Sequence, residues 1–120
     1  MTEPNDHAPI SVQTSQDETV PVTAVAGEID MSTADLVRDE VHARLAAKPD
    51  VLVLDLSAVE FIGSAGVHLL VHSQMEAEDH GTRLAVVVPE QSFASRVLRT
   101  AGVHQMLDLH TDLPSAMSTR

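Results

Sequence analysis

The chain has 120 residues, which suits one domain with a sizeable core. It contains no Cys, Trp or Tyr and only two Phe, so disulfides, thiol catalysis and cysteine-based zinc sites are excluded and the core must be aliphatic. Asp and Glu number 18 against 7 Lys and Arg, a net charge of −11, which makes nucleic acid and anionic membranes poor partners. A basic surface on another protein suits this charge better, although the charge would also serve solubility alone.

Residues 1–9 are mostly polar, and we expect them to form a flexible tail ahead of a single domain over residues 10–120. They lack the basic and then apolar pattern of a signal peptide. No apolar run approaches the length that spans a membrane, so we expect a cytoplasmic protein that does not bind membranes.

The first third of the domain predicts a strand pair. Residues 10–14 alternate apolar and polar side chains, as a short edge strand does, and residues 20–29 predict a second strand. Residues 16–18 would form the turn between them. We therefore expect an antiparallel pair at one edge of a sheet.

A helix is expected next, from Ser32 as its N-cap to about Lys48, before Pro49 stops it. Asp35, three residues after Ser32, would complete a weak capping box. Apolar side chains recur at the helical period, and we expect these to be buried: Ala34, Val37, Val41 and Leu45.

The stretch VLVLDLSAVEFIGSAG, residues 51–66, is the centre of the chain. Its first four residues are an unbroken aliphatic run closed by Asp55, which predicts a strand buried on both faces. A short loop would lead on to Gly63. The apolar periodicity of residues 66–80 predicts a helix that ends at Gly81.

The rest of the chain continues the alternation. Residues 83–88 predict an inner strand, and residues 103–109 predict a last short strand. Residues 113–117 would form one terminal turn of helix. The helix between the two strands is expected from residue 91 or 92 to residue 101, with one apolar stripe made of Phe93, Val97 and Ala101.

This order of elements is typical of an α/β fold. Strand–helix–strand crossovers are right-handed, so we expect a mostly parallel sheet of four to five strands with helices packed against it. Ligand and partner sites of such sheets gather at the carboxyl ends of the strands. Asp30 and Ser64 each follow a strand and are expected at that edge.

Ser64 is expected where a loop becomes a helix. The first N–H groups of a helix lack intrahelical partners, and the macrodipole places partial positive charge there. A phosphate carried by Ser64 would be well accommodated. On its residues alone, Ser64 is better explained as a helix cap only, which is a common role for serine.

Three segments carry a family pattern in the same order along the chain. They are GEID at residues 27–30, DLSAVEFIGSAG at residues 55–66 and VLRTAGVHQML at residues 97–107. Together they resemble STAS domains, in particular the bacterial anti-sigma factor antagonists. The resemblance implies the STAS fold and a serine phospho-acceptor, which is Ser64 in this sequence.

The same resemblance implies roles for the neighbouring residues. Asp55 and Ser57 match a structural element that is expected to hold the chain through side chain to backbone bonds. Gly63 stands where the family usually has Asp, and Ala65 where it usually has Ser or Thr. The residues expected to contact the partner are Asp30, Gly63, Ser64, Ala65, Gly66 and Val67. Asp30 could instead be a surface residue that only supports a helix cap.

The implied function is that of a non-enzymatic switch without a cofactor. The unphosphorylated protein would bind an anti-sigma factor with serine kinase activity and so release a sigma factor. Phosphorylation of Ser64 would end this binding, and a protein phosphatase would restore it. The alternative, which Gly63 and Ala65 favour, is a STAS scaffold or ligand-sensing module of a regulatory or transport complex that is not phosphorylated.

Catalytic and metal chemistry fit the sequence less well. A nucleophile elbow at Ser64 would need glycine in place of Ile62, and a P-loop would need a Gly-Lys-Ser or Gly-Lys-Thr ending. His68 and His72 are spaced as two metal ligands on one helix can be, but the sequence offers no evident third ligand. We expect them to be surface histidines, and we expect no metal site.

Overall fold

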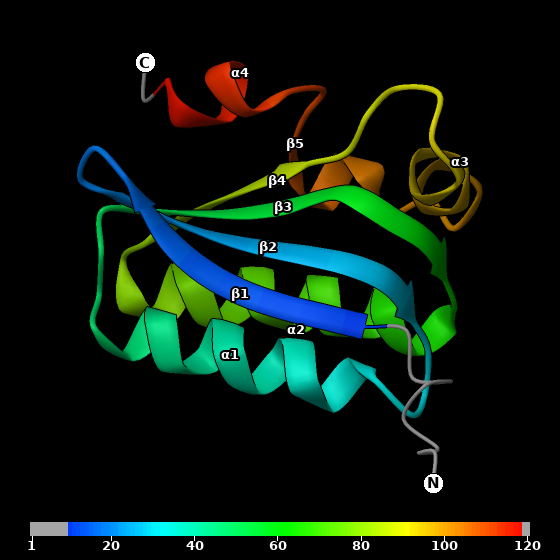
Figure 1. Ribbon diagram of the computed structural model, residues 1–120, viewed down its shortest axis with the longest axis horizontal. Coiled ribbons are helices and arrows are strands. Elements are labelled where there is room, and N and C mark those ends of the chain that lie inside the picture. Colours follow the sequence, from blue (N-terminus) through cyan, green and yellow to red (C-terminus); the bar gives the residue numbers. More distant parts are fainter. Residues whose placement is uncertain (1–9, 119–120) are drawn as a thin grey trace, which may run out of the picture.

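A five-stranded sheet in the order β1-β2-β3-β4-β5 forms the middle of the molecule (Figure 1). The computed structural model describes residues 10–118, so the predicted tail at residues 1–9 lies outside the described residues. β1 and β2 are antiparallel, and the pairs β2–β3, β3–β4 and β4–β5 are parallel, which confirms the predicted α/β architecture. In chain order the elements are β1 (Ile10–Asp17), β2 (Val20–Ile29), α1 (Ala34–Ala46), β3 (Val51–Ile62), α2 (Ser64–His80), β4 (Arg83–Val87), α3 (Phe93–Thr100), the 3₁₀ helix η2 (His104–Met106), β5 (Asp108–His110) and α4 (Leu113–Met117).

Helices cover both faces of the sheet. α1 and α2 lie side by side on one face, and α4 lies against the other (Figure 1). The larger part of the core lies between the sheet and the pair α1 and α2, and it also takes in Ala94 and Leu98 of α3. A smaller cluster lies under α4, where Ala116 packs on Val53 and Val87. The core is aliphatic, as the composition requires.

The prediction for α1 is right about burial and wrong about the first turn. The four residues predicted to be buried are the buried residues of this helix. The N-cap is Thr33 rather than Ser32, and Asp35 forms no capping box but pairs with Arg38 at 2.9 Å. The helix starts later than predicted because Ser32 donates from its N–H and its hydroxyl to Asp30 Oδ1. These hydrogen bonds hold Ser32 in a turn that precedes the helix.

β3 is longer than predicted. The residues before Gly63, which were expected to form a loop, continue the strand to Ile62. It stays paired with β2 through two register shifts, at each of which β3 contributes one extra residue. Leu56, Val59 and Ile62 point into the core along this half of the strand. The backbone partners that β2 provides allow an irregular segment to remain in the sheet.

The predicted last strand at residues 103–109 is wrong in its first part. Residues 104–106 form η2, and only residues 108–110 pair with β4. β5 pairs only with residues 85–87, the last three residues of β4. The residues between α3 and Asp108 therefore lie outside the sheet, and part of them forms η2.

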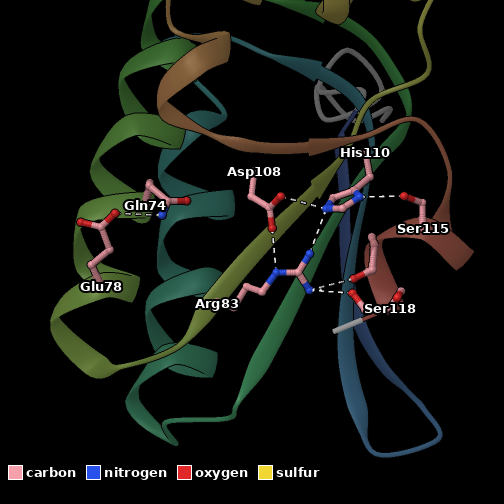
Figure 2. A network of polar contacts seen from close by, with 8 residues as sticks. Gln74, Glu78, Arg83, Asp108, His110, Ser115 and Ser118 are labelled. Atoms are coloured by element: carbon pink, nitrogen blue, oxygen red, sulfur yellow. Dashed lines mark hydrogen bonds and ion pairs between the residues drawn. The ribbon is translucent and has the colours of Figure 1, made fainter. Parts of the chain in front are cut away.

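A polar cluster centred on Arg83 joins β4, β5 and the C-terminal helix (Figure 2). The guanidinium of Arg83 contacts Asp108 Oδ2 at 2.8 Å and His110 Nε2 at 3.0 Å, and donates to the carbonyl of Ser118 at 3.0 Å. The other ring nitrogen of His110, Nδ1, lies 2.8 Å from Ser115 Oγ. Arg83 therefore ties three segments together at the end of the sheet.

We predict that Arg83→Gln lowers the free energy of unfolding by about 1–2 kcal/mol, because charge-assisted contacts to β5 and α4 are lost together. Urea unfolding followed by circular dichroism measures the change. Arg99→Gln is the matched control, since Arg99 is an exposed arginine that forms no ion pair within residues 10–118. Equal midpoints for the two variants would contradict a clamping role.

Candidate functional site

The carboxyl ends of β2 and β3 bring two of the predicted site residues to the same edge. Ile29 and Ile62 are register partners at the ends of these strands, and Gly63 N donates to Ile29 O at 2.9 Å. Asp30 follows Ile29, and Ser64 follows Gly63. The two residues therefore leave the sheet from adjacent strands, as predicted.

Ser64 is the first residue of α2, and its side chain is exposed. The N-cap is Gly63, so the interpretation of Ser64 as the cap is wrong. The first hydrogen bonds of the helix run from Gly66 N and Val67 N to Gly63 O, at 3.0 and 3.1 Å. The N–H groups of Ser64 and Ala65 are thus left without partners inside the helix, where they can stabilise an anionic group.

Gly66 is held tightly between the two strand ends. A Cβ atom on Gly66 would lie 2.5 Å from Ile62 Cγ1 and 2.9 Å from Ile29 Cγ2. This close approach lets the N-terminus of α2 pack directly on the strand ends. Gly66 is itself buried, so its contribution to a partner surface is to position its neighbours.

The other residues predicted to contact a partner differ in exposure. Val67 is buried and belongs to the core, and Ala65 is half-buried against it. Gly63 has extended backbone angles that any residue adopts, with φ −100° and ψ −171°. A Cβ atom at this position would meet Phe61 at 3.4 Å, which leaves room for a side chain.

Asp30 organises the turn between β2 and α1. Its Oδ1 accepts from Ser32 N at 2.9 Å, from Ser32 Oγ at 2.8 Å and from Thr33 N at 3.2 Å. The hydrogen bonds from Ser32, followed by those from Thr33, hold the pKa of Asp30 below its ordinary value of 3.8. Asp30 Oδ2 makes no hydrogen bond within residues 10–118, so it is the oxygen that remains free for a partner.

Asp55 and Ser57 contact each other at the first register shift of β3. Asp55 Oδ1 accepts from Ser57 N at 2.9 Å and also from Ser57 Oγ. The backbone between Ala24 and Ala26 of β2 faces this shift. The contact satisfies a strand N–H at a point where the regular ladder is interrupted.

A groove of about 730 Å³ opens beside Ser64, between the start of α2 and α3. Phe93 and Val97 line it, so the predicted stripe of α3 faces this groove, whereas Ala94 and Leu98 enter the core. The Phe93 ring stacks on Phe61, with 5.5 Å between the ring centroids. This surface was not predicted from the sequence, although the two Phe residues, in a chain without Trp or Tyr, were a signal for it.

His68 and His72 are exposed on α2, with 6.4 Å between their ring centroids. Across residues 10–118, the structure holds no group of three or more His, Cys, Asp or Glu side chains arranged to bind a metal ion. Among the helices described for this chain, none combines the length and the apolar character needed to cross a membrane.

We predict that Gly66→Ala lowers the free energy of unfolding by about 1–3 kcal/mol, because the added methyl group overlaps Ile62 and Ile29. Gly63→Ser is the matched control at the other end of the same turn. We expect it to keep or slightly raise stability, since its backbone angles suit serine and serine is a favoured N-cap. Urea unfolding of both variants provides the comparison, and equal losses would show that the packing of Gly66 is not limiting.

We predict that Asp30→Asn destabilises the protein at pH 7 and that its difference from the unchanged protein disappears in acid. The folded pKa of Asp30 is depressed, so the carboxylate stabilises the fold above pH 3.8, and this contribution is lost as the pH falls through the folded pKa. Urea midpoints measured from pH 7 to pH 3 show the trend. Asp50→Asn is the control, because the exposed Asp50 carboxylate makes no hydrogen bond in the described chain, and identical profiles for both variants would contradict the prediction.

Comparison with known proteins agrees with this architecture. The family model described as STAS domain matches residues 11–116. The chain is 31% identical over 109 residues to the anti-sigma-F factor antagonist RsfB of Mycobacterium tuberculosis, which covers 91% of this chain and 88% of that protein.

Solved structures show the same likeness. The crystal structure of an anti-sigma factor antagonist from Mycobacterium paratuberculosis has a TM-score of 0.82 and 30% identity, and the match covers 98% of this chain and 96% of that one. The unphosphorylated form of the anti-sigma factor antagonist SpoIIAA shares the fold, with a TM-score of 0.65 and 16% identity over 88% of this chain and 92% of the other. The chain therefore belongs to the STAS domain family, among the anti-sigma factor antagonists.

Proposed function

We propose that this protein is an anti-sigma factor antagonist in which residues 10–120 act as one domain in the cytoplasm. Its unphosphorylated form binds an anti-sigma factor and thereby releases a sigma factor. The observation that carries the proposal is an exposed serine at the first position of α2, beside an apolar groove, in a chain that resembles proteins of this name over nine tenths of its length.

The binding surface proposed here is the edge where β2 and β3 end. Asp30 and Ser64 offer polar contacts, and Gly63 and Ala65 present backbone that a partner can approach. Gly66 supports this surface from below, and Val67, although mostly buried, lines the groove beside it. Phe61 and Phe93 add exposed apolar area, of the kind that carries binding energy at protein interfaces.

The switch proposed is phosphorylation of Ser64 by the anti-sigma factor, which we infer to have serine kinase activity, and its removal by a protein phosphatase. A phosphate adds about −1.5 to −2 charges. The unpartnered N–H groups at the start of α2 can stabilise these charges without refolding the domain. The change is then felt at the interface through repulsion and bulk. The protein is a substrate and a binding module in this scheme, rather than an enzyme.

We predict that Ser64→Ala keeps the affinity for the anti-sigma factor and that Ser64→Asp weakens it by roughly 5- to 150-fold, the range of a coupling of about 1–3 kcal/mol. Calorimetry with the purified anti-sigma factor measures both affinities. With ATP present, the unchanged protein should gain one phosphoryl group at Ser64, whereas Ser64→Ala should gain none. Equal affinities for the alanine and aspartate variants would refute the switch.

The phosphorylation state of the native protein distinguishes the switch from the alternative, which is an unphosphorylated scaffold or ligand-sensing module. Gly63 and Ala65 are the residues that favour it, since they replace the side chains that usually flank the acceptor serine. Intact mass and peptide mapping of protein from its own host, before and after phosphatase treatment, decide between the two. A phosphoryl group on Ser64 supports the switch, and a chain that stays unmodified under several growth conditions supports the scaffold.

A further inference from the structure

Two basic side chains line the groove beside Ser64. His68 lies one turn after Ser64 on α2, and Arg96 reaches the same groove from α3. Both side chains are exposed. Residues four apart on a helix are neighbours, with about 5–6 Å between their Cβ atoms. His68 is therefore the nearest basic side chain along α2 to any group that Ser64 carries.

Arg96 is available to an anion. Within residues 10–118 it forms no ion pair, in contrast to Arg38, Arg44 and Arg83. Its guanidinium lies 6.0 Å from the centroid of the Phe93 ring and makes one long contact, 3.4 Å, to the carbonyl of Gln91. Arg99 also forms no ion pair within the described residues, but of the two only Arg96 lines the groove beside Ser64.

We propose that a phosphate on Ser64 is bound within the molecule by His68 and Arg96, which approach it from the two helices that form the groove. This inference rests on the proposed phosphorylation of Ser64. A phosphate held in this way lies over the groove, so phosphorylation covers the apolar surface of Phe93 and Val97 as well as adding charge. The free N–H groups of Ser64 and Ala65 complete the set of donors.

A phosphate bound by these two side chains has a lower second pKa than the phosphate of a free phosphoserine. The second pKa of phosphoserine is near 6, and nearby cations favour the dianion and so lower this pKa. His68 and Arg96 should each contribute, whereas His72 and Arg99 should not. His72 lies one further turn along α2, and Arg99 lies on α3 but does not line the groove.

The experiment places phosphoserine at position 64 during translation, so that no kinase is needed, and follows its ³¹P resonance from pH 4 to pH 8. We expect a titration midpoint about half a pH unit below that of a phosphoserine peptide spanning residues 60–66. His68→Gln and Arg96→Gln should each raise the midpoint by about 0.2–0.3 pH unit. The matched controls His72→Gln and Arg99→Gln should leave it unchanged, and 1 M salt should reduce the difference from the peptide.

Two results would overturn the proposal. A midpoint that neither His68→Gln nor Arg96→Gln raises would show that the phosphate is free in solvent, and a response to only one of the two variants would refute binding from both helices. Circular dichroism confirms that each variant is folded. Because the phosphoserine is installed without a kinase, the two proposals fail independently. A phosphate that is not bound by His68 and Arg96 would leave the kinase switch intact. Native protein without phosphate would refute the switch but leave this measurement valid.

Discussion

The site depends on how the ends of β2 and β3 are joined to the start of α2. Gly63 N donates to Ile29 O, and Gly66 leaves no space between the helix and the two isoleucines that end the strands. This contact determines where the first turn of α2 lies. The exposed position of Ser64 and the orientation of its free backbone N–H groups both follow from it.

The groove lies beside this edge and gathers aromatic and basic residues, which are few in this chain. The protein is acidic and nearly free of aromatic residues, yet both phenylalanines stack at the groove. Arg96, which forms no ion pair within residues 10–118, also lines it. An interface that needs apolar contact area and charge selectivity requires these residue types on one surface. Their gathering beside Ser64 is the feature of the fold that supports the proposed binding function.

The buried core begins at this edge, with Ile29 and Ile62, and continues along the sheet. The buried aliphatic residues of the central strands and of α1 and α2 form the larger core, and the Arg83 cluster joins the C-terminal helix to the opposite end of β4 (Figure 2). Asp30 connects the site edge to α1. Its Oδ1 accepts the hydrogen bonds that shape the turn into this helix, while its Oδ2 makes no hydrogen bond within residues 10–118. Under the proposed switch, a phosphate on the exposed Ser64 would alter the surface without entering the core.

The sequence by itself determined the order of strands and helices, the buried stripe of α1 and the shared edge of Asp30 and Ser64. These depend on local periodicity and on the rule that parallel strands end at one edge of a sheet. Only the tertiary structure decided the length of β3, because β2 supplies the hydrogen bonds that keep its irregular half in the sheet. It also decided that Ala94 and Leu98, rather than Phe93 and Val97, enter the core, since the packing orientation of a short helix depends on elements distant in sequence.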